Sequence, residues 1–179
     1  MGAANYNMVI AGFGGQGILF TGKVVAYAGL IDGQEVSWLP SYGPEMRGGT
    51  ANCSVCISDE PIGSPLVTQP DVLMVMNAPS FDKFVDTVAP GGKVFVDSTL
   101  VHNTTTRTDI EVFAIPATQL SHDEHLEGIA NIILLGKVLK EAAFASYETI
   151  EKSIGKCVPP AKIHLYEHNL RAIKLGMSL

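Results

Sequence analysis

A glycine-rich segment near the N-terminus has residues that could bind a phosphate group. Gly12, Gly14 and Gly17 have the spacing G-x-G-x-x-G directly after an apolar stretch, and Gly15 and Gln16 lie between the last two of them. Glycines at this spacing permit a tight turn and a close approach of a ligand, and the start of the following helix favours an anion. No carboxylate stands at the end of the second expected strand, where a dinucleotide's ribose would need one. The segment alone therefore predicts an anion contact or simply a tight turn, and it is weak evidence for a dinucleotide site.

The most unusual segment of the chain is a loop rich in glycine and proline. It consists of Ser41, Tyr42, Gly43, Pro44, Glu45, Met46, Arg47, Gly48 and Gly49. Because the loop follows the second expected strand, it lies on the sheet edge at which α/β proteins usually bind ligands. The planar guanidinium of Arg47 can hold a phosphate or a carboxylate. We expect a contact with a ligand or another subunit here, and the alternative is that Arg47 and Glu45 only pair with each other or decorate a turn.

The segment from Gly17 to Lys23 imitates a Walker A loop. Its spacing G-x4-G-K is right, but Val24 stands where a magnesium-binding Ser or Thr is needed. The segment is also expected to lie within a helix, which cannot wrap around phosphates. We therefore predict no Walker-type nucleotide site.

Cys53 and Cys56 form a C-x-x-C pair in Thr50–Ile57, a segment with the composition of a strand. Side chains three positions apart on a strand point to opposite faces, so the pair cannot share a metal without a bulge. Cys157 is distant in the sequence, and three cysteines cannot supply the four thiolates of an iron–sulfur cluster. We predict that these are core cysteines.

The histidines form two close pairs. His164 and His168 are spaced so that both could face one metal on a helix, but no third ligand is evident. His122 and His125 lie beside acidic residues at an expected helix start, which favours a solvated or capping role. No G-x-S-x-G elbow is present, and no pattern indicates a nucleophile with its base. We predict no catalytic and no metal-ligating residue in this chain.

Strands alternate with helices along most of the chain. The expected strands are Asn7–Ala11, Glu35–Pro40, Thr50–Ser58, Val72–Met76, Val94–Asp97 and Glu111–Ile115. Helices are expected over residues 16–30, 80–88, 121–144, 146–156 and 162–175. Ser80 is expected to cap the second helix, and Ser121 with Glu124 to form a capping box at the third. The pattern predicts an α/β fold, a three-layer α/β/α Rossmann-like domain with a mixed, mostly parallel sheet, over residues 1–179 as a single domain.

The composition is rich in apolar residues, at 46%, and lean in charged ones, at 17%. This favours a sheet buried on both faces, apolar surface reserved for partners, or both. The segment Ile129–Ala143 is apolar nearly all round, so it is either core or packed against another subunit. Self-association of the isolated chain, which would hide its partner surface, is consistent with this composition.

The charge and the terminal segments exclude several classes of protein. A net charge of -6 with scattered lysines and arginines argues against a nucleic-acid binder. No stretch approaches the roughly 18 apolar residues of a membrane-spanning helix. The N-terminal residues lack the basic region of a signal peptide, and an odd number of cysteines is typical of a reducing cytoplasm. We expect a cytoplasmic protein.

Several segments together resemble one family. They are GFGGQGILFTGK, WLPSYGPEMRGGTANCSVCISDEPIGSP, PDVLMVMN, PGGKVFVDS and IANIILLGKVL, in this order from Gly12 to about Leu139. This combination closely resembles the γ subunit of 2-oxoacid:ferredoxin oxidoreductases, and SYGPEMRGG is its most distinctive part. The segment WLPSYGPEMRGGTANC is most similar to γ subunits of the 2-oxoglutarate-type enzymes, and next to those of the branched-chain 2-oxoacid type.

The resemblance implies a subunit of a larger enzyme. Such complexes decarboxylate a 2-oxoacid on thiamine diphosphate with magnesium, join the acyl group to coenzyme A, and pass electrons through iron–sulfur clusters to ferredoxin. The resemblance implies α, β and δ subunits as partners, which carry thiamine diphosphate and the clusters, and no cofactor bound by this chain alone. It also implies that the segment Gly12–Gly17 and the loop Ser41–Gly49 line the face toward the catalytic subunits. Because an arginine-bearing loop lies next to the expected start of a helix, we further expect that Arg47 or the Gly14–Gly17 amides meet coenzyme A phosphates or order a loop of a neighbouring subunit.

Two other functions remain open from the sequence. A stand-alone nucleotide-dependent reductase would rest on the glycine segment alone, and binding of NADH or NADPH by the isolated chain would support it. A γ-like subunit of an indolepyruvate oxidoreductase would fit the same segments, and one large neighbouring gene in place of several small ones would favour it.

Overall fold

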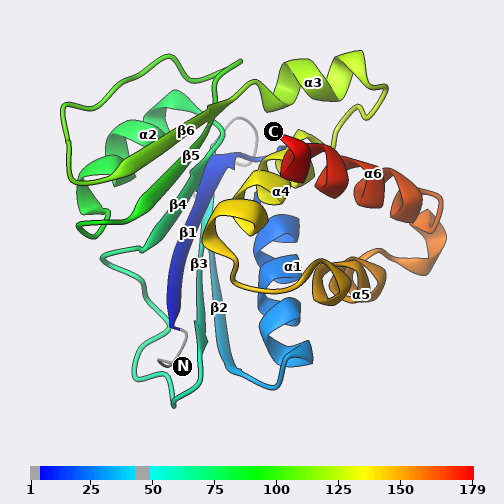
Figure 1. The fold of residues 1–179 in the computed structure, drawn as a ribbon, viewed down its shortest axis with the longest axis horizontal. Helices are drawn as coiled ribbons and strands as arrows, with labels where there is room; N and C mark the ends of the chain where they lie inside the picture. The colour runs from blue at the N-terminus through cyan, green and yellow to red at the C-terminus, as the bar shows by residue number, and fades with distance from the viewer. Residues whose placement is uncertain (1–4, 43–48) are drawn as a thin grey trace.

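The computed structural model of the chain describes residues 5–42 and 49–179. Within these residues one six-stranded sheet has the order β2-β3-β1-β4-β5-β6 (Figure 1). The strands are β1 (Tyr6–Phe13), β2 (Glu35–Tyr42), β3 (Thr50–Ser58), β4 (Val72–Val75), β5 (Lys93–Asp97) and β6 (Glu111–Ile115).

The sheet is mixed, as the sequence predicts. β1, β4, β5 and β6 pair in parallel, whereas β3 is antiparallel to both β1 and β2. The parallel neighbours need long crossovers, and the two antiparallel neighbours β2 and β3 are joined by the short connection from Tyr42 to Thr50. In the register, Tyr42 lies opposite Ala51, and Phe13 lies opposite Thr50. The start of β3 therefore lies beside the carboxyl end of β1.

The two outer layers are unequal. In the described part of the chain, one face of the sheet carries the long helices, and the other carries shorter helical segments (Figure 1). The long helices are α1 (Ile18–Ile31), α4 (Ala130–Ala142), α5 (Tyr147–Cys157) and α6 (Leu165–Ser178). On the second face lie α2 (Ala78–Phe84) and the short 3₁₀ helix η1 (Val85–Thr87), while α3 (Ala117–Asp123) follows β6 and the 3₁₀ helix η2 (Pro160–Lys162) joins α5 to α6. The three-layer α/β/α arrangement is confirmed.

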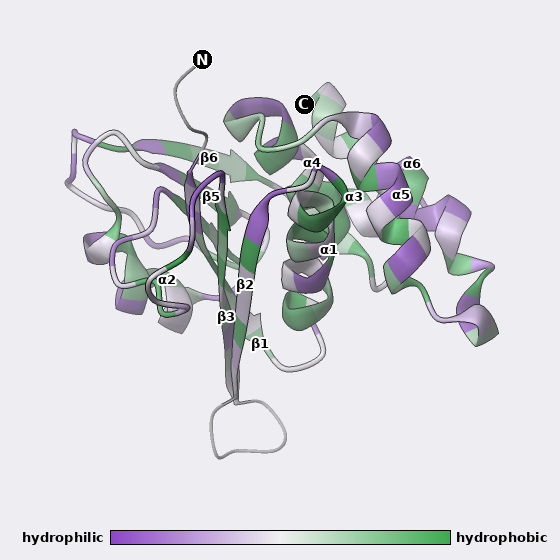
Figure 2. Ribbon diagram, turned by 90° about the horizontal axis from the view of Figure 1, so that it is seen from below, coloured by the Kyte–Doolittle hydropathy of each residue, from purple (hydrophilic) through white to green (hydrophobic). Residues whose placement is uncertain are grey.

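Hydrophobic residues concentrate on the strands and on α1 and α4, and polar residues on the outer sides of α5 and α6 (Figure 2). A larger buried cluster joins one face of the sheet to the long helices, and a smaller one joins the other face to α2. The apolar segment Ile129–Ala143 is core, because Ile132, Ile133, Leu134 and Leu135 of α4 are all fully buried in the larger cluster.

α1 lies close to the antiparallel pair β2–β3 because two of its residues lack side chains. A Cβ atom on Gly22 would lie 2.3 Å from the Cys53 sulfur and 2.9 Å from the Trp38 ring nitrogen. A Cβ atom on Gly29 would lie 2.7 Å from the Val36 side chain. Since these two glycines are seven positions apart, they lie on the same side of the helix, and they let its backbone rest on the sheet.

α4 and α6 cross with their backbones in contact. A Cβ atom on Gly136 would lie 2.3 Å from the carbonyl oxygen of Ile173, and one on Gly176 would lie 1.8 Å from that of Ile133. Real Cβ contacts of this kind do not occur, so each glycine is required by its partner's backbone. The crossing fixes the position of α4 on the sheet.

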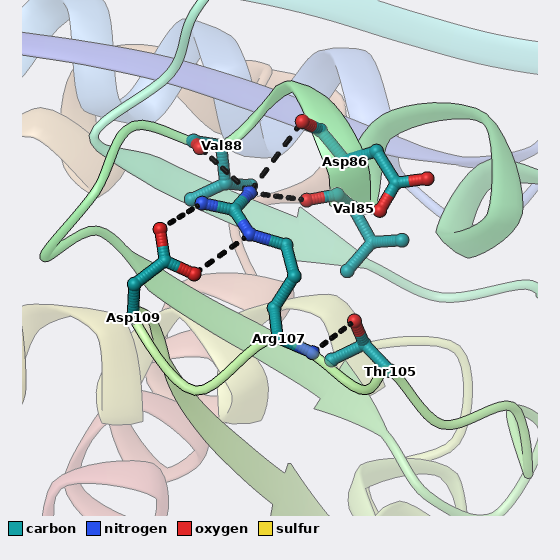
Figure 3. A network of polar contacts seen from close by, with 6 residues as sticks. All are labelled: Val85, Asp86, Val88, Thr105, Arg107 and Asp109. Carbon is teal, nitrogen blue, oxygen red and sulfur yellow. Dashed lines mark hydrogen bonds and ion pairs between the residues drawn. The ribbon is translucent and has the colours of Figure 1, made fainter.

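One arginine ties the long β5–β6 connection to the second face. Arg107 donates from Nη1 to the carbonyl oxygens of Val85 and Val88, at 3.1 and 2.8 Å (Figure 3). Its guanidinium also pairs with Asp109, with Nη2 2.6 Å from the carboxylate, and this hydrogen bond holds the pKa of Asp109 below its ordinary value. Because the bonded carbonyls are those of the first residue of η1 and of the residue directly after it, the arginine anchors the connection to both ends of that short helix.

Two helix starts differ from the prediction. Ser80 does not cap its helix: Asn77 is the cap, and its side chain accepts the Ser80 amide at 2.9 Å. Ser121 and Glu124 form no capping box, because Ser121 lies inside α3 and donates its hydroxyl to the carbonyl of Leu126. The expected helix 121–144 is two helices, separated by the left-handed backbone of His125 and Gly128.

Two strands extend beyond their predicted bounds. β1 and β2 are longer than predicted, so Gly12, Ser41 and Tyr42 lie in strands and not in turns. The extra residues of these strands pair with β3, and a local sequence pattern does not reveal such pairing.

Among the described residues, no helix is long and apolar enough to span a membrane.

We expect the Gly176→Ala substitution to destabilise the chain strongly. Its new methyl group would meet backbone on α4, which cannot move aside, and overpacking of this kind costs about 1–3 kcal/mol or more. The matched control is Gly155→Ala on α5, where the nearest atom is a Tyr166 ring carbon at 3.4 Å. Because glycine weakens a helix, this control should gain up to about 1 kcal/mol. Urea unfolding of the full chain measures both, and equal effects would contradict the backbone contact.

Candidate functional site

The glycine segment lies at the carboxyl edge of the parallel strands, between the end of β1 and the start of α1. Residues 14–17 connect Phe13, the last residue of β1, to Ile18, the first of α1. The amide of Gly14 donates to the carbonyl of Gly49 at 3.0 Å. This bond brings together the two segments that the sequence marks as unusual, because Gly49 is the last residue of the Ser41–Gly49 loop.

Three glycines of the segment are needed, two for their backbone conformation and one for space. Gly15 and Gly17 have φ angles of 93° and 74°, in the left-handed region that favours glycine. Gly12 is needed for space, because a Cβ atom there would lie 2.6 Å from the side-chain oxygen of Gln16. The turn is therefore specified by residues 12–17 together.

The Gln16 side chain joins two parallel strands at their ends. Its oxygen accepts the Phe13 amide at 2.6 Å, and its nitrogen donates to the Met76 carbonyl at 3.0 Å. Met76 directly follows β4, the parallel neighbour of β1. Since α1 and α2 leave these two strands toward opposite faces, Gln16 lies at the switch point of the sheet, where α/β proteins bind ligands.

A buried amide holds the segment from the helical side. Asn131, the second residue of α4, donates from Nδ2 to the Gly17 carbonyl at 3.2 Å and to the Thr21 hydroxyl at 3.0 Å. The Thr21 hydroxyl in turn donates to the same carbonyl at 3.0 Å. Gly17, the N-cap of α1, is thus fixed to α4 as well as to its own helix.

Two hollows flank the segment at the sheet edge. One, of about 310 Å³, lies between the first turn of α1 and Ala51, and the other, of about 250 Å³, lies between Gln16 and the start of α4. Their rims include Phe13 and Leu100, which expose 38% and 43% of their surface. No side chain caps α1, and its first turn has no acidic residue. The arrangement suits an anionic group at the helix start and an apolar contact beside it.

The family model described as pyruvate ferredoxin/flavodoxin oxidoreductase matches residues 7–179. The chain belongs to this family. One relative is the 2-oxoglutarate synthase subunit KorC of Methanocaldococcus jannaschii, 38% identical over 170 residues, which are 93% of this chain and 89% of KorC. Another is the ketoisovalerate oxidoreductase subunit VorA of Methanothermobacter thermautotrophicus, 38% identical over 167 residues. The match covers 93% of this chain but only 35% of VorA.

A solved structure of the same family shares the fold. The γ subunit of a keto/oxoacid ferredoxin oxidoreductase from Geobacter sulfurreducens superposes with a TM-score of 0.85 and 31% sequence identity. The match covers 98% of this chain and 95% of that subunit. The resemblance stated from the glycine segment and the SYGPEMRGG loop is therefore confirmed at the level of the family.

The structure brings together part of the predicted site of this oxidoreductase-family chain. Gly12, Gly14, Gly15, Gln16 and Gly17 surround the turn after β1, and Gly49 bonds to it. Ser41 is exposed at the end of β2, in which Tyr42 is the last residue. Gly43, Pro44, Glu45, Met46, Arg47 and Gly48 lie outside the described residues. The ligand or subunit contact expected of this loop therefore stays a prediction, and the pairing of Arg47 with Glu45 stays its alternative.

The topology of the family fold removes the basis for a dinucleotide site. In such a site a second parallel strand lies next to the first and ends in an acid that binds the ribose. Here the antiparallel strand β3 occupies that place, and its residues Thr50 and Ala51 lie beside the end of β1. The Walker-like segment is helical from Ile18 onward, as expected.

The cysteines and histidines of this family member form no metal cluster within the described part of the chain. Cys53, Cys56 and Cys157 are all buried and free, so the predicted core role is confirmed. The Cys53 side chain faces α1, whereas the Cys56 side chain, on the other face of β3, approaches the Ser64 carbonyl. Burial raises the pKa of Cys53 to about 12, while a hydrogen bond to Trp38 lowers it slightly. His122, His125 and His164 are exposed.

Asn131 is a residue of the site that the sequence motifs do not identify. The signal was present, because Asn131 interrupts the apolar run IANIILL with one polar side chain. A buried amide needs hydrogen-bond partners, so its position alone predicts a polar contact. What the pattern does not reveal is the partner, which lies 114 positions earlier in the chain.

The raised pKa of Cys53 predicts a loss of stability in alkaline solution. The unfolded chain releases this proton near its ordinary pKa of 9.0, but the folded chain keeps it until about 12. The free energy of unfolding should therefore fall as the pH rises from about 9 toward 12, by up to about 1.4 kcal/mol per pH unit. A Cys53→Ala variant, unfolded in urea over the same pH range, should lose this part of the slope. Parallel pH profiles for the two proteins would contradict the burial of the thiol.

Proposed function

We propose that the chain is the γ subunit of a 2-oxoacid:ferredoxin oxidoreductase. The observation that carries the proposal is the co-linear match to KorC over 93% of this chain and 89% of that subunit. A match over nearly the whole of a separate γ-type subunit favours a chain that works as one piece of an assembly. We accordingly propose that residues 1–179 form one γ domain, in the cytoplasm of a cell with anaerobic metabolism.

The proposed complex oxidatively decarboxylates a 2-oxoacid to an acyl-coenzyme A and passes the electrons to ferredoxin. Thiamine diphosphate, magnesium and the iron–sulfur clusters belong, on this proposal, to α, β and δ subunits. The residues of this chain do not fit a cluster, since its three cysteines are buried at separate places in the described structure. The proposed task of the γ chain is therefore to complete the assembly and to shape a surface at the catalytic subunits.

The substrate we propose is 2-oxoglutarate. The match to KorC, a 2-oxoglutarate synthase subunit, covers most of both chains, which supports this substrate. The match to VorA, a ketoisovalerate oxidoreductase subunit, makes a branched-chain 2-oxoacid the second candidate. On this proposal, the catalytic subunits select between the two substrate side chains.

We propose that the surface meeting these subunits consists of the glycine segment Gly12–Gly17 and the loop Ser41–Gly49. The bond between Gly14 and Gly49 joins the two segments into one surface. The uncapped start of α1 favours the phosphates of coenzyme A, and exposed Phe13 favours an apolar subunit contact beside them. The Arg47 guanidinium, as the basic group of the loop, is proposed to contact the same phosphates.

Co-purification tests the assignment as a subunit. The chain, tagged in its native cells and purified without oxygen, should bring down α, β and δ subunits in equal amounts. The complex should then reduce a dye with 2-oxoglutarate and coenzyme A at a much higher kcat/KM than with a branched-chain 2-oxoacid. A reversed preference would replace the substrate, and a chain that comes alone with a bound nucleotide would contradict the subunit proposal.

The Arg47→Ala substitution tests the proposed surface. Loss of a charge-assisted hydrogen bond costs about 1.5–3 kcal/mol, so the KM for coenzyme A in the reconstituted complex should rise about tenfold or more. The matched control is Arg171→Ala, which removes an exposed arginine that bonds to the Glu124 carbonyl. Arg47→Ala with unchanged assembly, coenzyme A KM and turnover would refute the contact.

A further inference from the structure

The carbonyl group of Gly17 accepts three hydrogen bonds in the interior of the chain. The donors are the Thr21 amide at 2.9 Å, the Thr21 hydroxyl at 3.0 Å and the Asn131 amide nitrogen at 3.2 Å. Thr21 is fully buried, and Asn131 is 3% exposed. A helical carbonyl ordinarily accepts a hydrogen bond from one backbone amide. Here two buried side chains donate to the same peptide oxygen in addition to that amide.

Gly17 and Asn131 are complementary in shape as well as in hydrogen bonding. A Cβ atom on Gly17 would lie 2.4 Å from Nδ2 of Asn131 and 2.9 Å from its side-chain carbon. The positive φ of Gly17 already disfavours any other residue, and the amide fills the space that a side chain would need. The conformation of Gly17 and the position of Asn131 therefore depend on each other.

Fixing this carbonyl also fixes the amide on its other side. A peptide group is planar and trans, so its N–H points away from its C=O. With the Gly17 oxygen held toward Thr21 and Asn131, the N–H of Ile18 must point out of the start of α1, toward the turn and its flanking hollow. The two side chains thereby set the direction of the first helical amide at the proposed surface.

The base of this contact is rigid. Asn131 is held near the start of α4, whose buried residues pack in the main core and whose Gly136 touches the backbone of α6. The Asn131 amide also donates to Thr21 at 3.0 Å, so it cannot turn without losing both acceptors. A short side chain on a packed helix gives a more exact position than a loop residue could.

We propose that Asn131 is the positioning residue of the glycine segment, which it holds in the one conformation that the assembled enzyme uses. The proposal rests on the proposed function, in which this segment meets coenzyme A phosphates. Asn131 acts through Gly17 and Thr21 and touches no substrate itself. Its loss should therefore change binding of coenzyme A while leaving the 2-oxoacid and the assembly unaffected.

The contact is tested first on the full chain alone, by amide hydrogen exchange. In Asn131→Asp, which keeps the shape but places a carboxylate oxygen against the Gly17 carbonyl, exchange at the Thr21 amide should be faster. Amides of β4 should change no more than in the control Ile133→Val, a mild core substitution on the same helix. An unchanged Thr21 amide would overturn the proposal.

A double-mutant cycle tests the steric half of the contact. Gly17→Ala should lower the free energy of unfolding for two reasons. The new methyl group would collide with the Asn131 amide, and alanine disfavours the positive φ at this position. In an Asn131→Ala background the collision is gone, so the same substitution should cost clearly less. Strict additivity would show that the two residues are independent, and would overturn the proposal.

The role in the enzyme is tested in the reconstituted complex. Asn131→Asp should raise the KM for coenzyme A at least fivefold, with the KM for the 2-oxoacid and the yield of complex unchanged, whereas Ile133→Val should change none of these. A coenzyme A KM within twofold of the unmodified complex would overturn the positioning role. If the unmodified complex itself turned over no 2-oxoacid with coenzyme A, the proposed function would fail. Amide hydrogen exchange and the double-mutant cycle would still decide whether Asn131 holds the glycine segment.

Discussion

The arrangement of the whole chain depends on how closely the backbone of α1 approaches the sheet. Gly22 and Gly29 remove the side chains that would hold the helix away from β2 and β3, and Trp38 and Cys53 fill the space beside Gly22. A helix that rests on its backbone has little freedom to shift, because each displacement brings main-chain atoms into collision. The start of α1, and with it the turn after β1, is consequently placed by packing far from the turn itself.

The antiparallel strand β3 gives this fold its own use of a familiar glycine motif. In a dinucleotide-binding domain the strand beside β1 runs parallel and ends near the ligand, whereas here β3 begins at that point. The consequence is that the connection after β2 returns beside the glycine segment, and Gly49 bonds directly to Gly14. The same local sequence is therefore bonded here to a second segment at Gly49, where the parallel fold would build a pocket for a ribose.

The sequence predicts the order and type of most elements, because alternation of apolar strands with helices is a local property. It predicts the mixed sheet from the short connection between β2 and β3, and the core role of the cysteines from their spacing. It misplaces the cap of α2, where Asn77 and not Ser80 is the local cap. It also fails where a distant contact decides, because Asp97, buried at the end of β5, accepts the Thr118 amide at the start of α3, whereas the sequence predicts a later capping box. Of the candidate site it predicts the glycine segment and Gly49, but not Asn131, since a pattern along the chain names a buried amide without its partner.

Buried polar side chains determine the register of the helical layer in a way that its apolar residues cannot. Apolar contacts are non-directional, so the apolar side chains of α1 add no directional restraint to its close backbone packing. Hydrogen bonds are directional, and a buried group left without a partner costs about 1–3 kcal/mol. The Ser153 hydroxyl donates to the Val24 carbonyl in the middle of α1 at 2.6 Å, and Asn131 binds Gly17 at the start of the same helix. α5 and α4 each hold α1 by such a bond. The position of the glycine segment is therefore determined by buried polar residues whose partners a local sequence pattern does not reveal.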